Sequence, residues 1–273
     1  TIGYTGQSPE RLKLHMENQD KFDEAAEQYQ SSAAIFTELD DQAQVRKVQH
    51  QQIKALALSG KETEARLQLG LLYGDAPMEA GKLCLELGWA EEAERYFESV
   101  VDSTQEPTER ARLLNRLGIL AARRSELPKA RELFLESLQL ARETSNDDLT
   151  ASVLNNLGEN YQSSGLYSKA EPCYLDALEH FKKTDGLSGQ AYALSNLGTL
   201  AFARGDYSEA LDYLNRAHLL SLNPDTFGGP HALMGTTLNA LGLVHQFLGR
   251  TEDAERLYLE AIAARRAVND LSG

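Results

Sequence analysis

The stretch Asn155-Asn156-Leu157-Gly158 belongs to a pattern that recurs about every 40 residues along this chain. Its glycine is followed seven residues later by Gly165, and Ala170 comes five residues after that. Three other copies keep this spacing, with Ser125 in place of the second glycine in the first copy. The leading glycines lie 40, 40 and 44 residues apart, at Gly118, Gly158, Gly198 and Gly242. A fixed period of this length predicts stacked supersecondary units in place of one compact globule.

One unit, residues 151–186, shows what is repeated. Apolar residues at steps of three and four predict a helix that ends at Gly165, a residue free to adopt positive φ. A second apolar stripe follows Ser168, a candidate N-cap. Gly158 and Ala170 are expected where the two helices cross, because larger side chains would separate them. Each unit is therefore predicted to contain a helix A, a tight turn, a helix B and a polar loop.

The combined pattern, L-G-x-x-Y followed by G-x-Y-x-x-A-x-x-x-Y-x-x-A-L, resembles the tetratricopeptide repeat. The 40-residue period resembles the longer-helix form in kinesin light chains and in peptide- or signal-sensing bacterial regulators. The resemblance implies an all-α, right-handed superhelical solenoid of about seven antiparallel helix pairs, with residues 1–273 as a single domain. The units are expected at about residues 5–40, 41–74, 75–104, 108–145, 148–186, 189–223 and 230–270.

Two segments depart from the repeat. The first unit keeps the apolar spacing of a helix B between Phe22 and Ala33, whereas its helix A, around residues 9–17, is degenerate. We expect it to be an atypical terminal unit. The loop from Asn223 to Pro230 carries the four extra residues of the 44-residue step and is expected to be irregular and mobile.

Composition limits the classes of function. The chain has 27 Lys and Arg against 41 Asp and Glu, a formal net charge of −14, so direct nucleic-acid binding is not expected. No apolar run approaches the roughly 18 residues needed to span a bilayer, and no membrane partner is expected. Cys84 and Cys173 lie too far apart along a stack for a disulfide and favour a reducing, cytoplasmic location. Because the chain starts at Thr1, we expect it to be part of a longer protein.

Motifs of catalysis are missing from the sequence. It has no phosphate loop, dinucleotide fingerprint, nucleophile elbow or H-E-x-x-H zinc motif. The six histidines are scattered, and His245 takes the place of the core residue Tyr161. Acidic residues on amphipathic helices are usually solvated. We therefore predict a binding protein and not an enzyme, with no cofactor and no metal.

In this architecture the helices A line a concave groove, at positions counted from the leading glycine of each unit. These positions carry mostly amides and hydroxyls. An amide donates and accepts together, which suits an extended peptide backbone. The resemblance implies that Asn156 and Asn196 hold the main chain of a ligand. The predicted partner-binding residues are Arg112, Asn115, Arg116, Arg123, Ser152, Asn155, Asn156, Glu159, Gln162, Tyr192, Asn196, Thr199 and Asn239.

The asparagines have a second interpretation. Asparagine is a poor helix former, so matched asparagines in successive helices need a reason. They could bond to one another and to the helix backbones, as a ladder that fixes the superhelix. The two interpretations are compatible, and both remain open at this point.

The arginines also have two interpretations. Arg112, Arg116 and Arg123 share one face of a helix and could grip an acidic segment or a C-terminal carboxylate. The same positions one unit earlier carry Asp75, Glu79 and Glu86. Three ion pairs between neighbouring helices would neutralise the arginines and stabilise by about 0–1 kcal/mol each.

The sequence thus predicts a protein-protein interaction module that holds a peptide or protein segment in its groove. The alternative is the ligand- or peptide-sensing part of a signal-responsive transcriptional regulator, in which a ligand shifts the superhelix pitch. A homo-oligomer through a terminal repeat is kept as a further option, because the last unit has no obvious capping helix.

Overall fold

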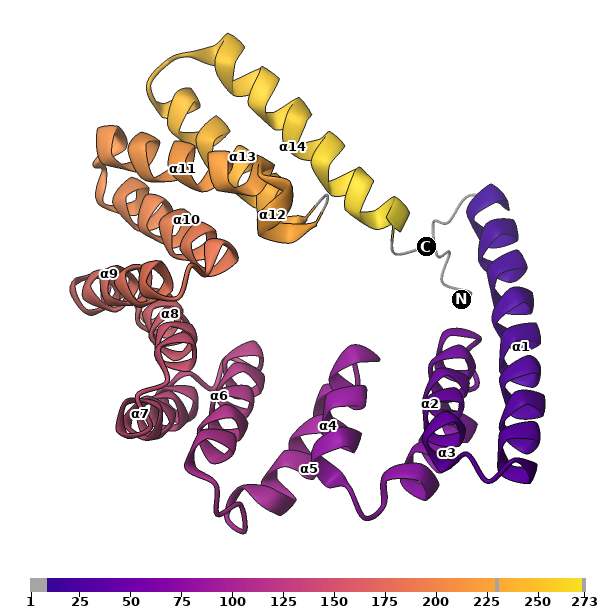
Figure 1. The fold of residues 1–273 in the computed structure, drawn as a ribbon. Helices are drawn as coiled ribbons and strands as arrows, with labels where there is room; N and C mark the ends of the chain where they lie inside the picture. The colour runs from indigo at the N-terminus through magenta and orange to yellow at the C-terminus, as the bar shows by residue number, and fades with distance from the viewer. Residues whose placement is uncertain (1–8, 229–230, 272–273) are drawn as a thin grey trace, which may run out of the picture. The chain divides into compact units, whose positions relative to one another are not determined.

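The computed structural model describes residues 9–228 and 231–271, and the side chains of residues 19–228 and 231–268. Regular structure in these ranges is entirely helical, in fourteen helices joined mostly by tight turns (Figure 1). The chain divides into two compact units, residues 1–100 and 101–273, which are described separately. The all-α class predicted from the repeat is confirmed, whereas one continuous solenoid over residues 1–273 stays a prediction.

The N-terminal unit begins with a helix that differs from the prediction. The sequence pattern suggested a degenerate helix A before a helix B, but α1 is one continuous helix, Pro9–Glu38. No glycine or proline occurs between residues 10 and 38, so nothing in the sequence ends the helix before the left-handed Asp40. The following helices of this unit are α2 (Gln42–Leu58), α3 (Glu62–Tyr73), α4 (Pro77–Glu86) and α5 (Ala90–Val101). α1 packs against α2, and α2 packs against α3.

The C-terminal unit contains four helix pairs of the predicted kind. Each helix A packs against the helix B that follows it, and in Figure 1 the helices A form the inner row of the unit. The pairs are α6 (Pro107–Arg123) with α7 (Leu127–Glu143), α8 (Asp147–Ser163) with α9 (Tyr167–Lys183), α10 (Leu187–Arg204) with α11 (Tyr207–Leu222), and α13 (Ala232–Phe247) with α14 (Thr251–Leu271).

The turn between helices A and B follows the predicted spacing. Gly165 has φ 71°, in the left-handed region that glycine enters without steric cost. Ser125 has φ 62° at the same place, although it carries a side chain. The N-cap predicted at Ser168 is wrong, because α9 begins one residue earlier and Leu166 is its N-cap. Because the turn is tight, α9 starts immediately after it, and the N–H of Ala170 donates to Leu166 O in its first turn.

The leading glycine of each unit lies where its two helices cross. A Cβ on Gly158 would lie 2.6 Å from the ring of Tyr174, and Ala170 is fully buried nearby. The same relation joins a glycine to the residue sixteen positions later in the other units, as Gly81–Phe97, Gly118–Phe134, Gly198–Leu214 and Gly242–Tyr258. The predicted close crossing is therefore confirmed, and an aromatic ring or a leucine fills the space that each glycine leaves.

The segment after α11 is less irregular than predicted. Pro224–Phe227 forms a one-turn helix, α12, which Asn223 caps by accepting from the backbone N–H of Asp225. Residues 229–230 lie outside the described part of the chain. Cys84 is buried and Cys173 is half-buried, and both are free thiols. In the part of the chain that the structure describes, no helix has the length and apolar character needed to cross a membrane.

Candidate functional site

An asparagine ladder connects three successive helices A. Asn156 Nδ2 in α8 donates to Asn115 Oδ1 in α6 across 2.9 Å. Asn196 Nδ2 in α10 donates to Asn155 Oδ1 in α8 across 3.1 Å. In each hydrogen bond the donor stands two residues before the leading glycine of its own unit. The acceptor stands three residues before the leading glycine of the preceding unit. The hydrogen bonds expected between asparagines of neighbouring helices are therefore present for these four residues, whereas their role in fixing the superhelix stays a prediction.

The ladder stops at α13 for a reason that the sequence contains. Ala240 stands two residues before Gly242, where α8 and α10 carry asparagine, and its methyl group cannot donate a hydrogen bond. Ser195, which would accept the next rung, lies 3.3 Å from Thr237 Oγ1 instead. Asn239 is half-buried on α13 and lies outside the lining of the two pockets described below.

Glu159 lies beside the ladder and accepts hydrogen bonds from two of its asparagines. Its Oε1 accepts from Asn196 Nδ2 at 3.0 Å and from Asn155 Nδ2 at 3.2 Å. The side chain retains solvent exposure, yet the surrounding protein atoms raise its pKa above the usual range by desolvation. The two amide donors act in the opposite direction and lower the pKa. Glu159 is thus a carboxylate held in place by two amides on the inner face of α8.

A pocket of about 350 Å³ opens between α8 and α10 on this face. Five of the predicted partner-binding residues line it, which places them in one site. Three further lining residues were not predicted, because they come from the end of α9 and the first turn of α10. We call this cavity the Tyr192 pocket, and its lining is Ser152, Asn155, Asn156, Glu159, Phe181, Ser188, Gly189 and Tyr192.

A second pocket of about 350 Å³ lies on the other side of Asn156 and Glu159, against α6 and α7. It contains one predicted arginine, Arg123, above an apolar wall. We call it the Arg123 pocket, and its lining is Ile119, Ala122, Arg123, Leu127, Phe134, Asn156, Glu159, Asn160 and Ser163. The two pockets share Asn156 and Glu159 and therefore form one interrupted site along the helices A.

Aromatic rings extend the Tyr192 pocket toward α13. The ring of Tyr192 meets Phe227 edge-on at a centroid distance of 6.1 Å and His231 at 5.9 Å. Phe227 and His231 stack on each other at 4.0 Å. Phe227 belongs to the extra residues of the long loop, so the repeat spacing gave no sign that it would lie here. The one sequence feature that indicates a role for Phe227 is that it is an aromatic residue in an otherwise polar insertion.

Two more unpredicted residues stabilise the wall of the Arg123 pocket. Asn160 is 2% exposed, and its Nδ2 donates to Leu127 O at 2.9 Å. Arg131 Nε donates to Asn160 Oδ1 at 3.1 Å, and its guanidinium lies 5.1 Å from the ring centroid of Tyr161. These contacts join α7 to α8 and fix the spacing of the two helices that enclose the pocket.

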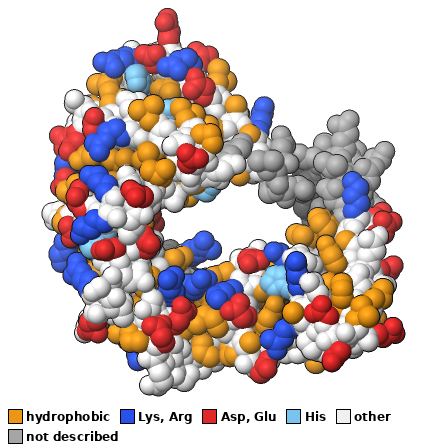
Figure 2. Space-filling model, viewed as in Figure 1, with side chains coloured by type: hydrophobic (Ala, Val, Ile, Leu, Met, Phe, Trp, Pro, Cys, Tyr) orange, Lys and Arg blue, Asp and Glu red, His pale blue; other side chains and the backbone are white. Residues whose placement is uncertain are grey.

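The predicted arginines take different environments. Arg112 pairs with Glu109 in its own helix at 3.5 Å, and Arg116 is half-buried. Figure 2 shows Lys and Arg side chains gathered where α6 borders the inner side of its unit. Within the N-terminal unit, Glu79 pairs with Lys82 and Glu86 with Lys54, each at 2.7 Å. The pairs proposed between Asp75, Glu79 or Glu86 and the arginines would join the two units and stay predictions.

The remaining predicted residues already make contacts within their own repeat. Gln162 Oε1 accepts from the hydroxyl of Tyr174 at 2.9 Å, and Thr199 Oγ1 donates to Asn196 O at 2.9 Å. Ser152 Oγ donates to Asp148 O at 2.9 Å while it lines the Tyr192 pocket. Among the described residues, no three His, Cys, Asp or Glu side chains are grouped as a metal site requires. Binding of a partner by any of these residues stays a prediction.

The chain belongs to the tetratricopeptide repeat family. The family model matches residues 109–183, 150–223 and 189–267, which together cover more than half of the chain. These matches fall on the helix pairs of the C-terminal unit, where the spacing of the glycines is most regular. No curated protein matches the sequence.

Solved structures with this fold include three that resemble most of the chain. BtubC (BKLC) from P. vanneervenii has a TM-score of 0.60 at 24% identity, covering 85% of this chain and 92% of its own. A Rap protein complexed with Competence and Sporulation Factor has a TM-score of 0.65 at 16% identity, covering 94% and 77%. A kinesin light chain-like protein from Podospora anserina with nearly identical TPR-like repeats has a TM-score of 0.54 at 17% identity, covering 71% and 95%. At these identities the likeness concerns the fold.

Proposed function

We propose that the C-terminal unit binds an extended peptide segment of a protein partner along the inner face of α6, α8 and α10. The observation that supports this most is the pair of pockets on either side of Asn156 and Glu159. Each pocket has room for a side chain, and the asparagines between them suit a peptide backbone. The role is non-enzymatic, and the two free thiols suit a reducing, cytoplasmic compartment.

The ladder and peptide binding are compatible because an amide has more hydrogen-bonding capacity than one rung uses. An asparagine offers two N–H donors and two acceptor lone pairs. In the described part of the chain, the ladder uses one N–H of Asn156 and leaves its other N–H and its oxygen for a ligand. Asn196 uses both donors on Asn155 and Glu159 and leaves its oxygen to accept a peptide N–H. The ladder thus preorganises the amides that would hold the main chain.

The two pockets differ in charge, which suggests the sequence of the peptide. The Tyr192 pocket combines the carboxylate of Glu159 with an aromatic ring, a combination that favours a Lys or Arg side chain. The Arg123 pocket shares Glu159 but adds a guanidinium beside an apolar wall, so it has no preference for a cation and favours an apolar or acidic side chain. We therefore infer a peptide with a basic residue at the Tyr192 pocket.

The test is a peptide array in which basic, acidic and neutral residues are varied independently, probed with the wild-type chain. Ser152→Phe should fill the Tyr192 pocket and abolish the selection for basic residues while the ladder stays intact. Ser168→Phe, at an exposed position on α9, is the matched control and should bind as the wild type does. Equal binding by both variants would overturn the proposed site.

The sensor alternative rests on a different observation. Tyr192 of α10 contacts Phe227 of α12 and His231 beside α13, so a ligand at Tyr192 touches a junction between two repeats. A ligand that displaced these rings would change the angle between the repeats. Small-angle scattering with and without a selected peptide discriminates the two functions, since an adaptor keeps its dimensions and a sensor changes them.

A further inference from the structure

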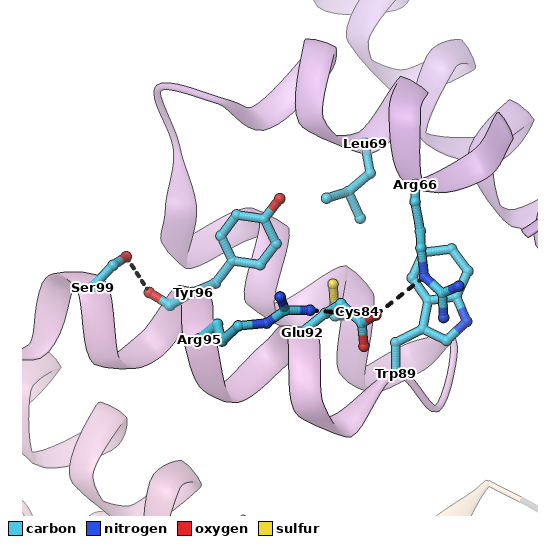
Figure 3. A pocket seen from close by; sticks show the side chains of 8 residues that line it. All are labelled: Arg66, Leu69, Cys84, Trp89, Glu92, Arg95, Tyr96 and Ser99. Carbon is cyan, nitrogen blue, oxygen red and sulfur yellow. Dashed lines mark hydrogen bonds and ion pairs between the residues drawn. The ribbon is translucent and has the colours of Figure 1, made fainter. Parts of the chain in front are cut away.

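A separate cavity of about 480 Å³ lies within the N-terminal unit, among α3, α4 and α5. Trp89, in the turn between α4 and α5, is the only tryptophan of the chain. Figure 3 shows the rings of Trp89 and Tyr96 on opposite sides of the cavity. We call it the Trp89 pocket, and its lining is Arg66, Leu69, Cys84, Trp89, Glu92, Arg95, Tyr96 and Ser99.

The floor of the Trp89 pocket is apolar. Leu69 is 2% exposed and Cys84 is fully buried. Burial raises the pKa of the Cys84 thiol to about 11, so the thiol is neutral at physiological pH and behaves as a small apolar group. With two aromatic rings added, the pocket offers an apolar body a place to bury its surface. Its volume falls within the range of about 300–1,000 Å³ that is typical of small-molecule sites.

The charged residues of the lining are not equivalent. The Arg66 guanidinium lies 4.7 Å from the Trp89 ring centroid and is held by Glu92 at 3.2 Å and by Glu62 at 3.1 Å. Arg95 makes a looser contact with Glu92 at 3.6 Å, and 73% of its side chain is exposed. A pair three residues apart on one helix, at this distance and with so exposed an arginine, contributes little. Arg95 is therefore able to turn from Glu92 to an incoming anion.

We propose that the Trp89 pocket binds a small monoanionic amphiphile, a molecule with an apolar body and a single carboxylate. The body lies between Trp89 and Tyr96 on the floor of Leu69 and Cys84, and the carboxylate pairs with Arg95. A charge-assisted hydrogen bond from a guanidinium distinguishes this ligand from a neutral molecule of the same shape. Two arginines and one glutamate in the lining disfavour a cation.

The experiment uses the intrinsic fluorescence of the full chain, which Trp89 alone supplies as tryptophan emission. Octanoate, octanol and octylammonium share one apolar chain and differ in charge, and each is titrated below its aggregation concentration. Octanoate should give a saturable change in emission and bind at least about fivefold more tightly than octanol, because only octanoate pairs with Arg95. Octylammonium should bind most weakly. Absence of a saturable change with octanoate, or equal affinity for the three probes, would overturn the proposal.

Two variants separate the charge from the cavity. Arg95→Gln should weaken octanoate about tenfold and leave octanol within about twofold, because only the charged pair is lost. Ser99→Phe, at an exposed lining position, should occupy the mouth and weaken both probes. Arg46→Gln removes an exposed arginine elsewhere in the same unit and should change neither. An octanoate affinity unchanged by Arg95→Gln in a variant of wild-type helicity would contradict the assignment.

Discussion

Asn156 and Asn115 are 41 residues apart in the sequence and 2.9 Å apart in the structure, where the amide of one donates to the carbonyl oxygen of the other. Both side chains are half-buried on the inner face of neighbouring helices A. The hydrogen bond depends on the register between the two repeats, because a shift of one helix by one residue would break it. Its energetic contribution can be isolated from that of each asparagine alone.

We expect Asn156→Ala to lower the free energy of unfolding by about 0.5–1.5 kcal/mol, the usual net contribution of a hydrogen bond. Asn115→Ala should cost a similar amount, and the double variant should cost less than the sum. Urea denaturation of the four proteins gives this double-mutant cycle. Strictly additive effects would mean that the rung adds no stability, and the asparagines would then serve the ligand alone.

Gly158→Leu is expected to lower the free energy of unfolding by a larger amount. The Cβ alone would lie 2.6 Å from the Tyr174 ring, so the two helices must separate or the ring must leave the core. Overpacking of this kind costs about 1–3 kcal/mol, occasionally more. Thermal and chemical unfolding measure the loss. Tyr174→Leu in the same chain, which imitates the Gly198–Leu214 crossing, should recover part of the lost stability, and no recovery would show that the steric conflict lies elsewhere.

A substitution at the turn between α6 and α7 should instead increase the free energy of unfolding. Ser125 adopts φ 62°, which costs a residue with a side chain roughly 1–2 kcal/mol relative to the right-handed region. Ser125→Gly removes this strain but adds freedom to the unfolded chain, so we expect a net gain of about 0.5–1 kcal/mol. The reciprocal change, Gly165→Ser, should be destabilising. Melting temperatures of the two variants that move in the same direction would contradict the argument.

The helix pairs of the C-terminal unit could be predicted from the sequence because each boundary carries a local chemical signal. Gly165 marks a left-handed turn, and Gly158 marks a crossing that leaves no room for a side chain. These requirements act within one repeat, so they recur with its period. In the first unit the repeat pattern predicts two helices, whereas the absence of glycine and proline between residues 10 and 38 agrees with the single helix α1 of the structure.

The candidate site was only partly predictable for a related reason. Residues on the inner face of helix A follow the period, and Asn155, Asn156 and Glu159 were found in this way. Phe181 lies at the end of a helix B and Phe227 in an insertion. The repeat spacing therefore does not predict that either residue lies near the site. The donor and acceptor roles in the ladder depend on the lateral offset of neighbouring helices A, which only the structure supplies.

The carboxylate of Glu159 links stability, pH and the proposed ligand. Desolvation raises its pKa in the folded protein, so the folded chain binds a proton more tightly than the unfolded chain does. Stability should therefore fall as the pH rises from the unfolded pKa of about 4.3 through the raised folded pKa, and then remain level. Glu159→Gln removes this ionisation, so the stability of the variant relative to the wild type should increase over the same pH interval. Urea unfolding at several pH values measures this difference.

The same variant should lose affinity for peptides with a basic residue, since the cation loses its counter-charge, while neutral peptides bind as before. If the relative stability of the variant fell over this pH interval, the hydrogen bonds from Asn155 and Asn196 would outweigh the desolvation of the charge, and the raised pKa would be contradicted.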